Sequence, residues 1–175
     1  MLGRVTGPMP GVAVERLHRA RLALMGLGED GARAGPGMFD ADVVSFAHGE
    51  GVRRPFPGAI RQAVEALREE SFDLSEIVVL SPLGAGSVAA TTSDPWLKSV
   101  LAQADGDTIK KGKIRFSSIQ AFKGLEAPAV IVTDLDRAAV PNFESVLYVG
   151  LTRATDRLYG VIEESTGLAG MARNQ

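Results

Sequence analysis

The chain has 175 residues, of which 45% are hydrophobic and 23% are charged, and its formal net charge is -2. This length suits one globular domain, and the small net charge excludes an overall basic field that would draw the protein to nucleic acid or to anionic membranes. Cysteine is absent, which excludes disulfides and thiolate chemistry and fits a reducing cytosol. Because no apolar run reaches the ~20 residues of a membrane span, we expect a cytoplasmic protein that does not contact a membrane.

The N-terminal part of the chain predicts a helix and a linker. Apolar residues recur at helical spacing from Val12 to Leu27, and Gly28 is a suitable stop. The glycine-rich stretch that follows predicts a linker. We therefore divide the chain into an N-terminal helix and linker, residues 1–37, and a folded domain, residues 38–175.

Beyond the linker, predicted strands and helices alternate along the chain. Short apolar or alternating runs predict strands, and apolar residues at i, i+4 and i+7 predict helices. The predicted strands are residues 41–48, 76–80, 113–119, 128–135 and 157–162. The predicted helices are residues 58–72, 93–105 and 142–155. This order predicts an α/β fold, in which a parallel sheet has helices on both faces, and the loops at the carboxyl ends of the strands are expected to bind ligands.

The loop after the second of these strands contains a glycine pattern. Gly84-x-Gly86-x-x-Ala89 matches a dinucleotide fingerprint, and Asp105 lies ~20 residues further on, as that motif expects. However, the helix that the motif needs would reach Pro95 after about one turn. We therefore favour a flexible loop and keep an NAD site as the alternative.

The lysines of residues 110–113 form a local basic cluster. Gly112-Lys113 resembles the end of a phosphate loop, but Ile114 stands where Ser or Thr should ligate magnesium, and Asp107 stands where the first Gly belongs. We therefore predict a solvated basic turn, with a contact to a nucleic-acid backbone as the alternative.

Two further segments resemble motifs of a known family. SSIQAFKGLEAPAVIV, residues 117–132, is similar to motif V of the UvrD/Rep family of superfamily 1 helicases, whose pattern is Thr-x-His-x-x-Lys-Gly-Leu-Glu before an apolar strand. LYVGLTRATDRLY, residues 147–159, is similar to motif VI, Tyr-Val-Ala/Gly-x-Thr-Arg-Ala. The recognisable part spans about residues 114–162. The resemblance implies a single RecA-like domain of the P-loop NTPase type, namely the C-terminal motor domain of an ATP-dependent DNA helicase.

By this resemblance, the cofactor is ATP, which binds between this domain and an N-terminal RecA-like motor domain. Arg153 is then an arginine finger that stabilises the γ-phosphate, and Glu126 accepts a hydrogen bond from the ribose. Gly124 lets the backbone approach the nucleotide closely, and Lys123 contacts phosphate or braces the turn. The structural alternatives are a surface cap or ion-pair partner for Glu126, and offsetting of a helix dipole for Arg153.

The resemblance also implies single-stranded DNA as a partner. Ser118 and Gln120, which stand where the family usually has Thr and His, lie beside the strand or couple it to the ATP site. Both are alternatively ordinary turn residues. Tyr148 and Thr152 support the helix that ends near Arg153, and we expect Tyr148 in the core.

The chain lacks the Walker A loop and the magnesium carboxylates of a complete ATPase. Mg²⁺ is therefore expected only through the first motor domain, and no metal ligand is predicted here; Asp134 and Asp136 are expected to have structural roles. We expect a fragment or truncated chain that binds ATP poorly and hydrolyses it negligibly by itself. The alternative from a different class is a non-catalytic regulatory or partner-binding module that descends from such a domain.

Overall fold

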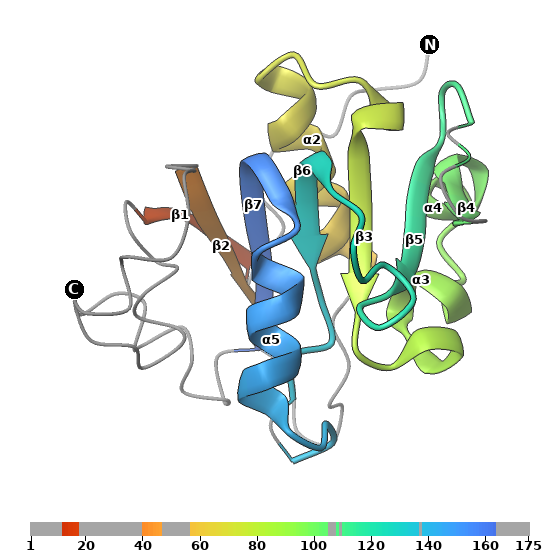
Figure 1. The fold of residues 1–175 in the computed structure, drawn as a ribbon. Coiled ribbons are helices and arrows are strands. Elements are labelled where there is room, and N and C mark those ends of the chain that lie inside the picture. The colour runs from red at the N-terminus through yellow and green to blue at the C-terminus, as the bar shows by residue number, and fades with distance from the viewer. Residues whose placement is uncertain are drawn as a thin grey trace, which may run out of the picture.

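The fold is seen in a computed structural model, which describes residues 12–17, 40–46, 57–104, 108, 110–136 and 138–163. A single sheet of seven strands runs through it in the order β1-β2-β7-β6-β3-β5-β4 (Figure 1). The strands are β1 (Val12–Leu17), β2 (Asp40–Phe46), β3 (Ile77–Ser81), β4 (Leu101–Gln103), β5 (Ile114–Ser118), β6 (Ala127–Val132) and β7 (Ala154–Glu163). Every neighbouring pair is parallel except β1 and β2. The predicted parallel sheet is therefore confirmed for the five strands from β7 to β4, and β2 extends it.

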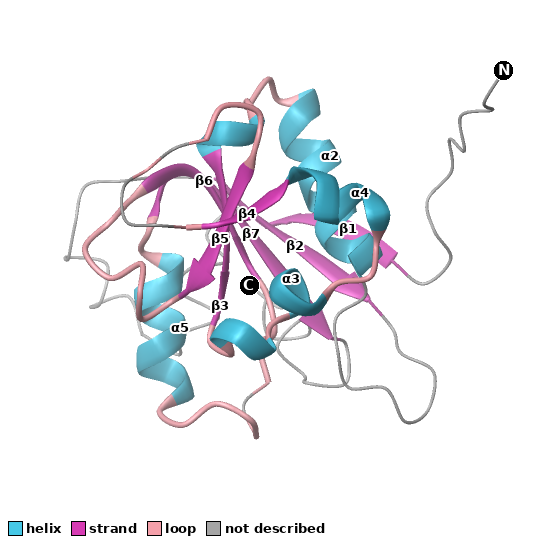
Figure 2. Ribbon diagram, turned by 90° about the vertical axis from the view of Figure 1, so that its right-hand side faces the viewer, coloured by secondary structure: helices cyan, strands magenta, loops and turns pink. Residues whose placement is uncertain are grey.

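Helices cover both faces of the sheet, as predicted (Figure 2). The helices are α2 (Pro57–Glu69), α3 (Val88–Thr91), α4 (Pro95–Val100) and α5 (Phe143–Leu151), with short 3-10 turns η2 (Leu74–Glu76) and η3 (Gly84–Gly86). Helices α2, α3 and α4 pack in one core cluster, and α5 packs in the other. The sheet therefore separates α5, whose C-terminus precedes Arg153, from the other three helices.

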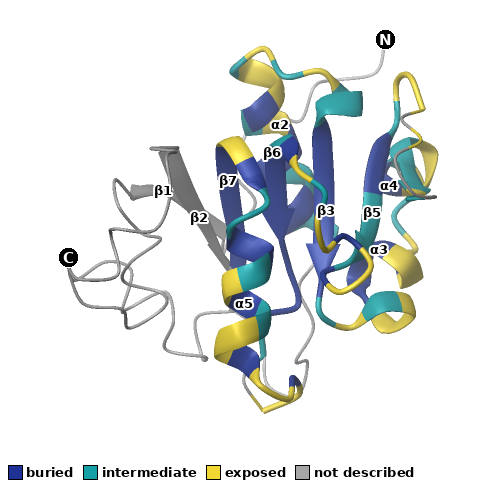
Figure 3. Cartoon of the chain, viewed as in Figure 1, coloured by how far each residue is buried: buried dark blue, intermediate teal, exposed yellow. Residues whose placement is uncertain are grey.

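The alternation of side chains along β3 explains how one strand serves both cores. Ile77 and Val79 pack with α2 and α4, whereas Val78 and Leu80 pack with α5. All five residues of β3 are buried (Figure 3). This near-continuous apolar run is what a strand covered on both faces requires.

The helix predicted from Val12 is wrong for residues 12–17, which form β1. β1 is antiparallel to β2, and Val14 lies opposite Val44. The β-branched valines of both segments favour strands, and the backbone pairing prevails over the helical spacing of the leucines. Residues 18–37, with the rest of that predicted helix and the linker, lie outside the described residues, and the boundary after residue 37 stays a prediction.

The helix predicted over residues 93–105 is also too long. It begins as expected, because the Asp94 carboxylate accepts a hydrogen bond from the Leu97 amide at 2.8 Å and Pro95 occupies the first turn. It ends at Val100, and β4 follows at once and pairs with β5. Pairing at the edge of the sheet therefore decides where α4 stops. Within the part of the chain that is described, no helix is long and apolar enough to cross a membrane.

Candidate functional site

We call the side of the sheet where the parallel strands end the carboxyl edge, and the side where they begin the amino edge. The segment between β5 and β6 connects these two sides without a helix. It starts at the carboxyl edge, where the Ile119 amide donates to the Ser81 carbonyl at 3.0 Å. It ends at the amino edge, where the Ala127 amide donates to the Arg153 carbonyl at 3.0 Å. Ile119 and Phe122 are each 1% exposed and anchor the segment in the core beneath α5. The residues of the first motif are therefore distributed between two edges.

At the amino edge, Arg153 joins the two motifs. Helix α5 positions it by burying Leu147 and Leu151 against the sheet. The Arg153 guanidinium donates from Nε to the Val149 carbonyl at 3.0 Å, from Nη2 to Thr152 Oγ1 at 3.0 Å, and from Nη1 to the Leu125 carbonyl at 3.5 Å. The last of these contacts links positions that are 28 residues apart in the sequence.

Glu126 and Gly124 lie on the chain next to the carbonyl that Arg153 contacts. Glu126 is exposed, and its carboxylate makes no hydrogen bond or ion pair with another described residue. Gly124 has a φ of +88°, and a Cβ placed there would meet nothing within 4 Å. Glycine is favoured at this position by the backbone conformation rather than by a lack of space. The amino edge thus presents the Glu126 carboxylate and the Arg153 guanidinium, and Gly124 lies at the end of the turn that leads to them.

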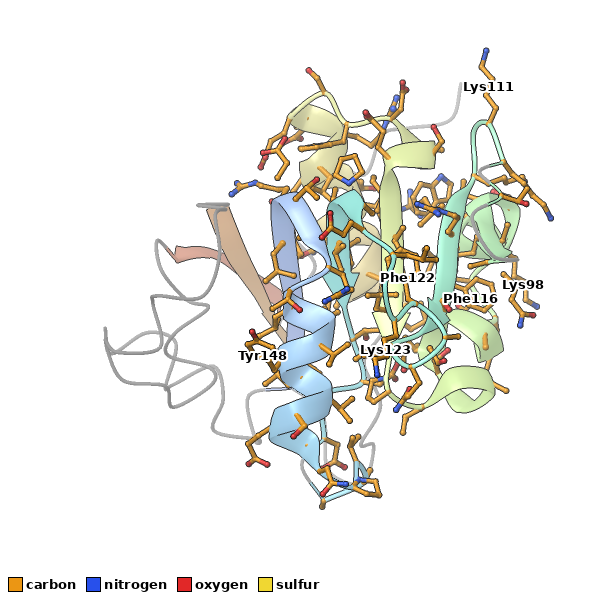
Figure 4. The ribbon with its side chains drawn as sticks, viewed as in Figure 1. Lys98, Lys111, Phe116, Phe122, Lys123 and Tyr148 are labelled. Carbon is orange, nitrogen blue, oxygen red and sulfur yellow. The ribbon has the colours of Figure 1, made fainter. Side chains whose placement is uncertain are left out.

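At the carboxyl edge, Ser118 and Gln120 belong to one compact turn. Ser118 Oγ accepts from the Ala121 amide at 3.0 Å, and the Gln120 carbonyl accepts from the Lys123 amide at 3.2 Å. The side chains of Gln120 and Lys123 are exposed. Figure 4 shows Lys123 toward the end of the sheet to which β3 and β5 point, far from Lys111. Ser118 and Gln120 are therefore brought together with Lys123, and separated from Arg153.

This arrangement corrects one expectation. The loops of both motifs were expected at the carboxyl ends of the strands, but Glu126 and Arg153 directly precede β6 and β7, whose first residues, Ala127 and Ala154, are paired. The cause is connectivity. Helix α5 runs back against the direction of the strands, so its C-terminus reaches the amino edge.

The glycine pattern after β3 forms a loop rather than a dinucleotide site. Residues Gly84–Gly86 make a 3-10 turn, and the following α3 has only 4 residues. A dinucleotide fingerprint needs a full helix whose N-terminus faces the pyrophosphate. Asp105 lies outside the described residues. A Cβ on Gly84 would lie 3.7 Å from Ser118 Cβ, so this loop is the immediate neighbour of the Ser118 turn.

Asp134 and Asp136 have the structural roles that were expected. Asp134 is 5% exposed with a φ of +59°, and its carboxylate accepts from the Val88 amide at 3.3 Å and 3.4 Å. Asp136 Oδ1 accepts from the Ala138 amide at 2.9 Å within its own loop. The described residues contain no group of three His, Cys, Asp or Glu side chains that could hold a metal ion.

The basic turn is confirmed at the amino end of β5. Lys110 and Lys111 are exposed, and Lys113 Nζ donates to the Ser99 carbonyl at the end of α4. In Figure 4, Lys111 projects from the sheet at the end opposite to Lys123. The cluster therefore does not belong to the turn that holds Ser118 and Gln120.

Sequence reasoning placed Tyr148 wrongly and missed two contacts of Arg153. Tyr148 is 41% exposed on the outer face of α5, not in the core. The backbone carbonyls of Val149 and Leu125 have no sequence signal, because any residue supplies one. The Thr152 hydroxyl could have been suspected from its place beside Arg153.

Comparisons with known proteins identify a family for part of the chain and a solved structure with a similar fold. Residues 113–161, which include every predicted site residue, match the family model of the UvrD-like helicase C-terminal domain. Among solved structures, the chain is similar to the C-terminal domain of a possible DNA helicase from Lactobacillus plantarum WCFS1, with a TM-score of 0.57 and 17% identity over 91% of this chain and 94% of that one. No curated protein matches the sequence. The predicted resemblance to UvrD-like helicases is thereby confirmed for residues 113–161, and the predicted α/β fold is confirmed by the similarity to that solved domain.

Proposed function

We propose, from the match of residues 113–161 to the UvrD-like helicase C-terminal domain, that this chain is the C-terminal motor domain of an ATP-dependent DNA helicase or translocase. The observation that supports this most is the meeting of the two motifs at the amino edge, where Arg153 contacts the Leu125 carbonyl beside Glu126. A structural cap would need the arginine only. The exposed Glu126 carboxylate, which has no ion-pair partner among the described residues, and the neighbouring Arg153 together suit a ligand that carries both hydroxyl groups and phosphates.

In this proposal, the amino edge is one wall of an ATP site. The Glu126 carboxylate accepts from the ribose hydroxyls, Gly124 allows the backbone to approach, and the Arg153 guanidinium stabilises charge on the γ-phosphate during transfer. The other wall, with the phosphate-binding loop and the Mg²⁺ carboxylates, belongs to a first motor domain. Because those groups provide most phosphate affinity, this domain alone should bind ATP weakly.

The carboxyl edge is the proposed contact with single-stranded DNA. Gln120 offers both donors and acceptors to bases or sugars, and Ser118 fixes the turn that presents it. Lys123, which the family resemblance placed near the nucleotide, extends the same turn, and we propose that it contacts a phosphate of the strand. Residues 119–126 then link the DNA contact at the carboxyl edge to the ATP site at the amino edge, so that a movement of the chain at one site is transmitted to the other.

Paired substitutions test this division in a two-domain protein, in which the chain is joined to a first motor domain. We expect Glu126→Ala to weaken ATP binding roughly 10-fold or more, because a hydrogen bond to a charged group is lost, with DNA affinity unchanged. We expect Gln120→Ala to weaken single-stranded DNA binding about 2- to 10-fold, with ATP affinity unchanged. Titrations of a fluorescent ATP analogue and a labelled oligonucleotide measure both.

The rival function is a partner-binding module that retains the fold without the chemistry. It predicts that neither substitution changes either affinity. Lys123→Gln, measured in the same two titrations, decides whether Lys123 contacts the DNA strand or the nucleotide. A loss of DNA affinity that lessens the salt dependence supports the strand contact, whereas a loss of ATP affinity alone returns Lys123 to the nucleotide.

A further inference from the structure

The Arg153 guanidinium donates through more of its nitrogens than the guanidinium groups of Arg61 and Arg68 do. Nε, Nη1 and Nη2 each donate to an acceptor within the domain, namely Val149, Leu125 and Thr152. By contrast, Arg61 and Arg68 each donate through one guanidinium nitrogen. Holding all three nitrogens fixes both the position and the plane of the group.

Thr152 has a double role in this arrangement. Its Oγ1 donates to the Val149 carbonyl at 3.1 Å and accepts from Arg153 Nη2 at 3.0 Å. The same Val149 carbonyl accepts from Arg153 Nε. Thr152, Val149 and Arg153 thus form a closed ring of hydrogen bonds on the last turn of α5, and a hydroxyl is the only group at position 152 that can both donate and accept there.

These three contacts do not use all the N–H donors of the Arg153 guanidinium. An arginine has five N–H donors, so these three hydrogen bonds leave two N–H groups for a ligand. A planar group with two free donors matches the oxygens of a phosphate. A group that is fixed before the ligand arrives avoids the ordering cost that a flexible arginine would incur at the moment of reaction.

We propose that Thr152 is a positioning residue that, together with the Leu125 carbonyl, pre-orients Arg153 for an anionic ligand such as the γ-phosphate. Its catalytic consequence rests on the proposed function, but the pre-orientation itself does not. The Leu125 carbonyl ties the orientation to residues 119–126, because any shift of that segment moves one of the three acceptors. Arg153 therefore caps α5 and presents a donor pair at the same time.

Chemical modification of Arg153 in the isolated chain tests the pre-orientation without any nucleotide. Phenylglyoxal reacts with guanidinium groups that can leave their acceptors, and peptide mass spectrometry gives a separate rate for each arginine. In the wild-type chain, we expect Arg153 to react more slowly than Arg61 and Arg68, whose side chains are 43% and 50% exposed. If Arg153 reacts as fast as these two, the pre-orientation does not exist, whatever the variants show.

Two substitutions then isolate the hydroxyl. Thr152→Val keeps the shape and should raise the Arg153 rate about 3- to 10-fold, the range for one hydrogen bond. Thr152→Ser keeps the hydroxyl and should leave it within about 2-fold of wild type. The rates of Arg61 and Arg68 serve as the control for folding and should not change. An unchanged Arg153 rate in folded Thr152→Val would overturn the role of Thr152.

ATP turnover in the two-domain protein separates this proposal from the proposed function. Thr152→Val should lower kcat about 3- to 10-fold with KM unchanged, and Thr152→Ser should restore it. If Arg153→Ala leaves turnover intact while the modification rates behave as expected, the function fails and the pre-orientation stands. If turnover depends on Arg153 but not on the Thr152 hydroxyl, the positioning role fails and the function stands.

Discussion

At the scale of single residues, the hydrogen bonds of Arg153 are compatible with both roles considered for it, namely the helix cap and the proposed contact with the γ-phosphate. Its guanidinium offsets the C-terminal end of α5 through Val149, which is the structural role considered from the sequence. The same group contacts Leu125 beside the exposed Glu126. Because these hydrogen bonds use only some of the N–H donors of the guanidinium, the helix cap also holds the remaining donors in place. The sequence identified Arg153 as a candidate, but the acceptors that hold its side chain are seen only in the structure.

Gly124 supports a prediction at this scale, with Gly112 as its matched control. Their φ values are +88° and +71°, and a Cβ at either position would meet nothing within 4 Å. Gly124→Ala and Gly112→Ala should each lower the free energy of unfolding by about 1–2 kcal/mol through backbone strain alone. Chemical denaturation measures this cost.

The two glycines should differ in function. Gly124 belongs to the proposed ATP wall, whereas Gly112 belongs to the basic turn before β5. In the two-domain protein, only Gly124→Ala should weaken binding of the ATP analogue. Equal ATP affinities for the two variants would show that the backbone near Gly124 does not approach the nucleotide.

At the scale of elements, a partly buried ion pair connects β7 to the end of α2. Arg157 Nε lies 2.6 Å from Glu70 Oε2, and Nη2 lies 2.9 Å from Oε1. The Tyr159 hydroxyl donates to the same carboxylate at 3.3 Å. Glu70 directly follows α2, so the pair ties the helix that covers one face of the sheet to β7, the strand that begins directly after Arg153.

We expect this pair to matter far more than an exposed one. The Arg157 side chain is 7% exposed, so Glu70→Ala would leave a buried cation without its carboxylate and should cost about 2–4 kcal/mol. Glu65→Ala removes the ion pair between Glu65 and Arg61, whose side chains are 54% and 43% exposed, respectively. This substitution should lower the free energy of unfolding by less than ~0.5 kcal/mol. Urea unfolding of the two variants compares them directly. Similar losses of the free energy of unfolding would mean that the Arg157–Glu70 pair contributes little to stability.

The sequence predicted the elements with strong local signals and failed where tertiary pairing decided. The apolar run of β3 and the amphipathic spacing of α2 needed no further information. The end of α4 at Val100 depends on pairing with a strand 13 residues further along the sequence, since Leu101 pairs with Ile114, and nothing in the local pattern indicates this pairing. Likewise, the motif residues were recognisable, but their division between two edges follows from a crossover without a helix, which spacing alone does not indicate.

At the scale of the whole molecule, the fold presents two separated surfaces on one rigid sheet. Ser118 and Gln120 lie at the carboxyl edge, and Glu126 and Arg153 lie at the amino edge. The net charge of -2 provides no overall attraction for DNA or nucleotide, so local groups must supply both affinities. The chain contains no Walker A loop, so we expect it not to turn over ATP by itself, and the proposed function has to be tested together with a first motor domain.

The most direct test is single-stranded-DNA-stimulated ATP turnover in the two-domain protein with Arg153→Lys. Lysine keeps the charge but cannot match three acceptors and a phosphate with one planar group. We predict a loss of kcat of about 10³-fold or more, as arginine fingers show, in a variant that still unfolds in a single cooperative transition. Turnover within about 10-fold of wild type would contradict the account and favour a partner-binding module.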